Sequence, residues 1–312
     1  MNYTKKVRLF THTDMDGYAA LVVARCYFKE EDIFVEHCNY DNVDDRVEHF
    51  MNTVTEDTQY VFITDISVKR EDIADKLDIC DKLFPKITVK LLDHHQSALH
   101  LNKYDFAKVM VEKDGELICG AKLFYQYLVE ELGFKRKPTL EKWLKIVNDY
   151  DTWLWENKYH YELPKFWNEL FFTYDNDTFV DNVLKKIKKG NLDFNDTDNL
   201  LLNIEHSKQA NYIKGKLKTL TEKKILGYNC VICFAEQYLA ELATAMYEAN
   251  PDSDIQIIIT SRSISYRCRN NDNNVNLSEF AANFGGGGHA KAAGSVINKD
   301  IQNEYLKLLF NE

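Results

Sequence analysis

His12-Thr13-Asp14-Met15-Asp16-Gly17 follows directly on the apolar run Val7–Thr11, and it precedes an apolar stretch from Tyr18 to Phe28. The first run predicts a β-strand, and the glycine with the stretch after it predicts a helix. The histidine and the two aspartates therefore lie where a strand passes into a helix. This order is typical of an α/β protein built on a parallel sheet.

Acidic residues follow two further predicted strands. The run from Val61 to Thr64 stops at Asp65, and the run from Ile87 to Leu92 stops at Asp93-His94-His95. Ligands of open parallel sheets bind outside the carboxyl ends of the strands, so we expect these motifs to gather at one edge. A helix cap would explain any single acid. Three together favour a shared site, and clustered carboxylates require a positive charge such as a divalent metal ion.

Together with Asp149, these motifs resemble the DHH phosphoesterase superfamily, which is named after the element present here as Asp93-His94-His95. The stretch from Phe284 to Gly294 is similar to the glycine-rich signature of the DHH-associated domain. The motifs occur in the family's order and span nearly the whole chain. The resemblance is to RecJ-like and nanoRNase-like phosphodiesterases.

The expected fold is α/β, with a doubly wound parallel sheet in an N-terminal domain, a helical connector and a smaller α/β C-terminal domain. The alternation of strands and helices supports the first of these. The expected boundaries are 1–155 for the catalytic metal-binding domain, 156–222 for the connector and 223–312 for the DHH-associated substrate-binding domain.

The resemblance implies two divalent metal ions, with manganese as the expected metal. One ion would be held by Asp16, Asp65, His94 and Asp149. The other would be held by His12, Asp14 and Asp65, so that Asp65 bridges. Asp93 is expected to orient His94, and His95 is expected to face the substrate phosphate as a donor or proton carrier; these two are the predicted catalytic residues.

Two of these assignments have alternatives. Asp151 lies two residues beyond Asp149 and competes for the same role, but Asp149 fits the family pattern better because Ile146-Val147-Asn148 precedes it. His12 lies two residues before Asp14, as in RecJ-type relatives and unlike the pyrophosphatases. Whether His12 is a direct ligand stays open, and a pyrophosphatase is disfavoured.

A substrate-binding site is expected near the C-terminal end. Glycines permit positive φ and let backbone N–H groups approach an anion, although a flexible turn is the alternative explanation for a glycine run. By resemblance, an arginine on the preceding strand would bind a terminal phosphate. The predicted set is Ser265, Arg267, Gly286, Gly287, Gly288 and His289.

Composition limits the partners. The 312 residues contain 39 Lys and Arg against 49 Asp and Glu, a net charge of −10, which argues against long duplex DNA. The sequence shows no signal segment and no apolar run that would cross a membrane, so a cytoplasmic protein without a membrane partner is expected. Seven scattered cysteines predict reduced thiols, with Cys230 and Cys233 in the core rather than on zinc. A homodimer is left open.

These features predict a hydrolase, a metal-dependent phosphodiesterase that cuts short single-stranded oligoribonucleotides to nucleoside monophosphates. Two alternative activities are removal of a phosphate from adenosine 3′,5′-bisphosphate and hydrolysis of cyclic or linear dinucleotides. A nucleotide-sensing module without turnover is a further alternative, but it would not need the complete carboxylate set. Trp153, Trp155 and Trp167 either stack bases or pack in the core, and core packing is preferred.

Overall fold

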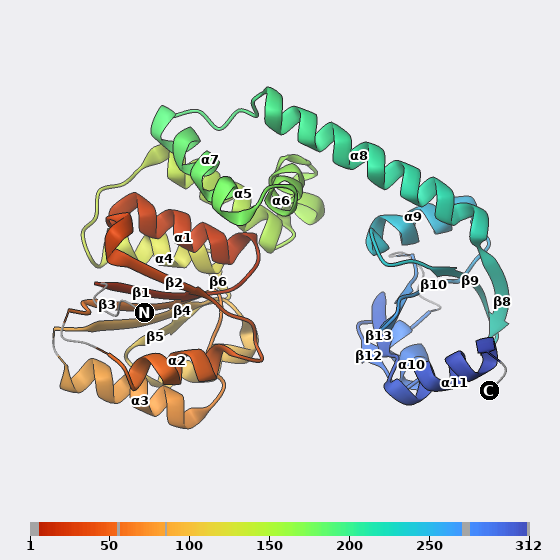
Figure 1. Ribbon diagram of the computed structural model, residues 1–312, viewed down its shortest axis with the longest axis horizontal. Helices are drawn as coiled ribbons and strands as arrows, with labels where there is room; N and C mark the ends of the chain where they lie inside the picture. Colours follow the sequence, from red (N-terminus) through yellow and green to blue (C-terminus); the bar gives the residue numbers. More distant parts are fainter. Residues whose placement is uncertain (1–5, 55–56, 85, 270–274, 311–312) are drawn as a thin grey trace. The chain divides into compact units, whose positions relative to one another are not determined.

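The computed structural model describes residues 6–54, 57–84, 86–269 and 275–310. The chain divides into two compact units, Met1–Leu202 and Asn203–Glu312 (Figure 1). The first unit includes most of the segment expected as a connector. The three-part division at residues 155 and 222 stays a prediction.

The first unit is built on a parallel sheet of five strands in the order β2-β1-β3-β4-β5, which confirms the predicted fold class. The strands are β1 Val7–Thr11, β2 Ile33–His37, β3 Tyr60–Thr64, β4 Thr88–Asp93 and β5 Ala107–Val109. All of β1 and most of β3 are buried. Parallel strands covered on both faces read as continuous apolar runs, which is why β1, β3 and β4 were visible in the sequence.

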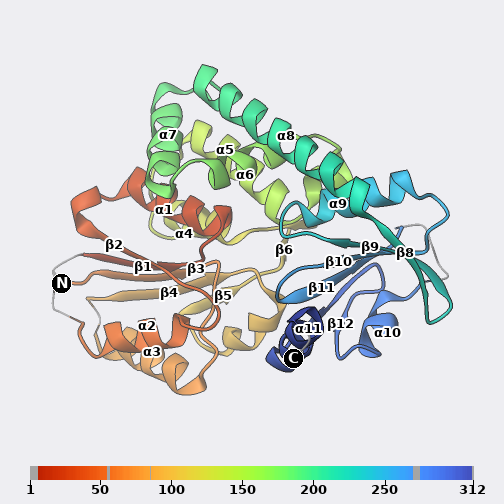
Figure 2. The ribbon, with the colours of Figure 1, turned by 45° about the vertical axis from the view of Figure 1, so that its right-hand side comes forward.

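Helices cover both faces of this sheet, as Figures 1 and 2 show. α1 (Met15–Tyr27) and α4 (Gly120–Glu130) form one apolar core with Val7 and Leu9. α2 (Val43–Met51) and α3 (Glu71–Leu83) form a second core with Phe10. Successive side chains of a strand point to opposite faces, so the short strand β1 supplies both cores.

Three further helices pack on the α1 side. These are α5 (Pro138–Asp151), α6 (Leu163–Thr173) and α7 (Asn176–Lys189). Trp167 is 2% exposed and belongs to this core, whereas Trp153 is 54% exposed. The connections contain the short helices η1 Glu30–Asp32, η2 Gln96–Lys103 and η3 Trp155–Tyr159, and the hairpin of β6 Glu112–Lys113 with β7 Glu116–Leu117.

The long helix α8 (Asp196–Lys216) leads into the second unit, whose sheet has the order β12-β13-β11-β10-β9-β8. Its strands are β8 Thr221–Ile225, β9 Tyr228–Phe234, β10 Ile255–Ile259, β11 Ser263–Arg267, β12 Gly287–Gly288 and β13 Ala292–Val296. Its other helices are η4 Leu217–Thr219, α9 Leu239–Ala249, α10 Leu277–Ala282 and α11 Lys299–Phe310. Two apolar clusters of its own stabilise this unit.

The seven cysteines are free, as expected, and Cys230 and Cys233 are buried. Along the described part of the chain, every helix is too short or too polar to span a lipid bilayer.

Candidate active site

The acidic motifs meet at the carboxyl edge of the first sheet. His12, Asp14 and Asp65 offer ligand atoms that lie within 4.8 Å of one another, and so do Asp16, His94 and Asp151. These side chains come from the ends of β1 and β3, from the residues after β4 and from the end of α5. The topology thus brings together residues that are up to about 140 positions apart.

The first motif is fixed by the start of α1. Asp14 caps the helix, accepting the Gly17 N–H at 2.9 Å, while its other carboxylate oxygen lies 2.8 Å from His12 Nδ1. A Cβ at residue 17 would lie 2.1 Å from the His12 carbonyl oxygen. Glycine is therefore required for the strand to turn into the helix at this distance.

Asp16 is held by another helix. It is 2% exposed, and its carboxylate accepts the Gly120 N–H at 2.7 Å and the Ala121 N–H at 3.1 Å. These N–H groups belong to the first turn of α4, where the helix dipole favours an anion. The start of α4 therefore fixes Asp16 beside the other carboxylates.

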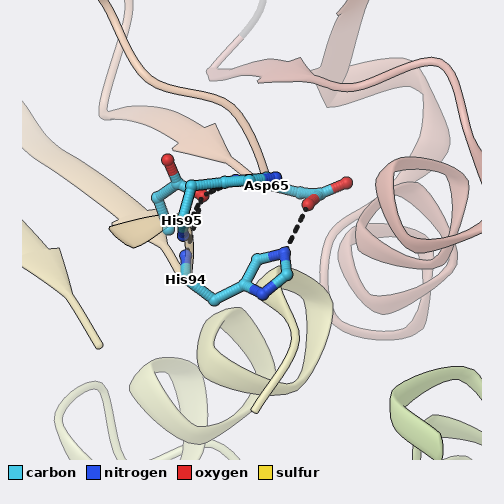
Figure 3. A group of neighbouring side chains, drawn as sticks. Asp65, His94 and His95 are labelled. Carbon is cyan, nitrogen blue, oxygen red and sulfur yellow. Dashed lines mark hydrogen bonds and ion pairs between the residues drawn. The ribbon is translucent and has the colours of Figure 1, made fainter. Parts of the chain in front are cut away.

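Asp65 is fully buried and has a left-handed backbone with φ 58°. Its Oδ1 lies 3.2 Å from His94 Nε2. Figure 3 marks this contact with a dashed line. Its Oδ2 has no hydrogen-bond donor among the described residues and lies 3.9 Å from His12 Nδ1. Asp65 thus faces both histidines. Residues in unusual backbone conformations cluster at functional sites.

The fourth position differs from the prediction. Asp151 Oδ2 lies 3.4 Å from His94 Nε2 and accepts no hydrogen bond within the described chain. Asp149, the predicted ligand, instead contacts Tyr161 and accepts from Lys145 Nζ at 2.5 Å. Residues two positions apart on a helix point in directions about 200° apart, so only one of the two can face the site. The structure places Asp151 there.

The role expected for Asp93 is also different. Its Oδ1 lies 2.7 Å from His95 Nδ1 and accepts the backbone N–H of His94 at 2.7 Å. Its Oδ2 accepts the Ser67 hydroxyl at 2.5 Å. Asp93 therefore orients the ring of His95 and not that of His94, because the His94 ring turns toward Asp65 and Asp151.

The electrostatics of this cluster fit a divalent cation. Burial, followed by the charges of neighbouring aspartates, raises the pKa of Asp65 and of Asp151 well above the usual range. Burial also raises the pKa of Asp16 and lowers that of His94. Carboxylates that repel one another, carboxylate oxygens without donors and a neutral imidazole form a ligand set suited to Mn²⁺ or Mg²⁺.

The predicted substrate residues lie in the second unit, where the glycine run has a structural use. Gly287 and Gly288 form the edge strand β12, paired with Gly294 and Ala293. The Gly286 N–H donates to the Ala281 carbonyl, and a Cβ on Gly286 would lie 2.2 Å from the Gly294 carbonyl oxygen. Close packing of backbones therefore explains this glycine. An anion-binding role for the run stays a prediction.

Ser265 and Arg267 lie on β11, as expected from the sequence, and His289 is exposed in the turn before β13. Arg267 is partly buried, which lowers its pKa, and its Nη1 donates to the Tyr266 carbonyl at 3.0 Å. Their role in substrate binding also stays a prediction.

Sequence reasoning missed Gly120 and Ser67. Gly120 carries no polar side chain, and its use becomes visible only when α4 is placed against Asp16. Ser67 lies two residues beyond Asp65, and no sequence pattern marks it as a hydrogen-bond donor to Asp93.

The doubly wound sheet and the His/Asp cluster at its carboxyl edge define an α/β protein with a candidate centre for divalent metal ions. The chain is 30% identical over 306 residues to the oligoribonuclease NrnB of Bacillus subtilis (strain 168), a match that covers 97% of this chain and 75% of that protein. It is 23% identical over 356 residues to a 3′,5′-cyclic-nucleotide phosphodiesterase of Helicobacter pylori (strain ATCC 700392 / 26695), covering 96% of this chain and 97% of that protein.

Among solved structures, RecJ from Thermus thermophilus in complex with Mn²⁺ has the same fold, with a TM-score of 0.54 and 13% identity over 97% of this chain and 51% of that chain. No protein-family model matches the sequence. The chain belongs to the DHH phosphoesterase superfamily. It is a phosphodiesterase of the DHH type.

Proposed function

We propose that this protein uses two divalent metal ions, with manganese preferred, to hydrolyse short single-stranded oligoribonucleotides to nucleoside monophosphates. The observation that supports the proposal best is the convergence of His12, Asp14, Asp16, Asp65, His94 and Asp151 in a chain similar throughout to an oligoribonuclease. The net charge of −10 favours a short strand over long duplex DNA.

The proposed ligands divide into two groups that share Asp65. His12, Asp14 and Asp65 would hold one ion, and Asp16, Asp65, His94 and Asp151 would hold the other. Divalent ions supply positive charge to the phosphate and activate water as a nucleophile. The buried carboxylates fix the positions of this charge, and the lowered pKa of His94 keeps its ring neutral and able to bind.

His95 is the proposed donor to the substrate. The hydrogen bond to Asp93 raises the pKa of His95 and fixes the hydrogen on Nδ1. Its Nε2 would donate toward an oxygen of the phosphate or of the leaving group, either directly or through a hydroxyl that contacts that oxygen. In this proposal Asp93 does not contact the substrate.

A second candidate is hydrolysis of cyclic or linear dinucleotides. The relative named as a 3′,5′-cyclic-nucleotide phosphodiesterase supports cyclic phosphodiesters as a substrate class, but its name does not mention dinucleotides. Incubating the protein and Mn²⁺ with RNAs of two to five nucleotides, cyclic dinucleotides and adenosine 3′,5′-bisphosphate would compare these substrates. The proposal expects the largest kcat/KM on short RNA and mononucleotide products. Preference for a cyclic dinucleotide or for the bisphosphate would reject it.

A further inference from the structure

Tyr40 borders the metal-binding cluster although no sequence motif marks it. It lies in the loop between β2 and α2, and its side chain is 43% exposed. Its ring centroid lies 5.2 Å from that of His12 and 5.8 Å from that of His95. A side chain that reaches solvent and also touches two histidines of the site is placed to meet a bound ligand.

The loop that carries Tyr40 is fixed on both sides. The Lys69 Nζ donates to the Tyr40 carbonyl at 2.6 Å and lies 5.4 Å from the centre of its ring. The Thr13 hydroxyl donates to Asn39 Oδ1 at 2.9 Å. These contacts connect the loop to the segments after β1 and β3, so the tyrosine is held in place before a substrate binds.

The Tyr40 hydroxyl ends a chain of hydrogen bonds that begins in the buried sheet. Ser67 donates to Asp93, Asp93 binds His95 Nδ1, and His95 Nε2 lies 2.9 Å from Tyr40 Oη. Both ring nitrogens of His95 are therefore engaged. His95 can act on a ligand through the phenol without losing either contact.

The phenol can donate a hydrogen bond of its own. Either atom of the Tyr40 Oη–His95 Nε2 pair can supply the hydrogen between them. When Nε2 supplies it, the hydroxyl keeps its own hydrogen for a ligand. A phosphoryl oxygen brought to the neighbouring carboxylate cluster by metal ions would be an acceptor for it.

We propose that Tyr40 is a catalytic residue whose hydroxyl donates a hydrogen bond to the substrate phosphate, positioned by His95 and Asp93. This inference rests on the proposed function and assigns a substrate contact to a residue outside the family motifs. The ring contributes by holding the hydroxyl between His12 and His95.

The test is a double-mutant cycle on a short RNA with Mn²⁺, using Tyr40→Phe, His95→Gln and both together. Removing one donor to a developing charge typically costs about 100-fold in kcat, and we expect this for Tyr40→Phe with little change in KM. The double variant should be no slower than the slower single variant, because both residues act in one chain of donors. Tyr104→Phe is the control, since the Tyr104 hydroxyl also donates to an aspartate, Asp75, at 2.7 Å. It should behave as wild type.

Tyr40→Phe with the wild-type kcat, or losses that multiply in the double variant, would overturn the inference. The inference would also be overturned if Tyr40→Ala lowered kcat while Tyr40→Phe kept the wild-type kcat, because the ring alone would then be needed. Mn²⁺ titration of each variant shows whether the metal ions still bind, and weakened binding in Tyr40→Phe would contradict a donor role. A wild-type protein inactive on every substrate would reject the proposed function together with this inference. If the wild type is active and Tyr40→Phe has the same kcat, this inference alone would be rejected.

Discussion

The backbone N–H of Gly120 donates to the carboxylate of Asp16 at 2.7 Å, although the two residues are 104 positions apart in the sequence. Gly120 also packs against the backbone of Asp65. The first residue of one helix thus touches two of the proposed metal ligands.

Gly120→Ala should reduce both stability and activity. The added Cβ would lie 2.6 Å from Asp65 Cβ and 2.7 Å from Asp65 Cα. Overpacking in a core costs about 1–3 kcal/mol, and the displaced Asp65 should weaken Mn²⁺ binding. Urea unfolding and Mn²⁺ titration measure the two effects. Gly215→Ala is the control, because no atom lies within 4 Å of its added Cβ and alanine is a better helix former. An unchanged Gly120→Ala would contradict this packing.

Asp65→Asn should abolish Mn²⁺-dependent hydrolysis and raise the melting temperature in EDTA. The folded-state pKa of Asp65 is raised by burial and by neighbouring aspartates, so its ionised form destabilises the metal-free fold as the pH rises through the unfolded-state pKa. Asparagine tolerates the left-handed backbone at this position. Turnover assays and thermal unfolding in EDTA check both parts. Retained turnover would remove Asp65 from the ligand set.

Asp151→Asn and Asp149→Asn should separate metal binding from stability. The first variant should weaken Mn²⁺ affinity by at least about 10-fold, because a proposed ligand is lost. The second should keep this affinity and unfold more easily, since Asp149 is buried and accepts hydrogen bonds from Lys145 and Tyr161. Calorimetric Mn²⁺ titration and urea unfolding distinguish them. The reverse result would restore Asp149 as the ligand.

Asp198 should make the first unit sensitive to acid. Burial raises its pKa, but hydrogen bonds from Lys186, from the Asn195 N–H and from Tyr174 outweigh burial, so the net pKa is lowered from 3.8. A lowered folded-state pKa contributes stability above the unfolded-state value, and this contribution disappears as the pH falls through the folded-state value. Breaking a buried ion pair costs about 3 kcal/mol, so Asp198→Asn should lose about this much at pH 7.

The acid dependence is measured by comparing the urea unfolding of wild type and Asp198→Asn from pH 7 downward. The difference between the two proteins should stay constant down to about pH 5 and shrink below 3.8. A difference that does not depend on pH would assign the effect to packing instead of charge.

The sequence predicted the sheet well where strands are buried on both faces. β1 was predicted with the observed ends, and β3 and β4 were predicted within one residue. β2 and β5 were missed because edge strands are short or only partly buried, so their apolar pattern is weak.

The site was predictable where an acid follows a strand, because a strand end fixes position along the sheet. It was less predictable on α5, where the motif did not specify which side of the helix faces the cluster. The choice between Asp149 and Asp151 depends on the rotation of that helix against α4, and no local pattern encodes this rotation. Asp93 pairs with His95 and not with His94 because the segment after β4 sets the directions of the two rings. No local sequence pattern encodes these directions.

The proposed metal ligands extend along the sequence from His12 to Asp151. Each strand end contributes only some of the ligands. A ribosome must therefore add about 140 residues after His12 before any hydrolytic centre can assemble. Fragments from interrupted translation that end before α5 would lack Asp151 and with it a complete set of ligands. Such fragments would therefore be inert as phosphodiesterases.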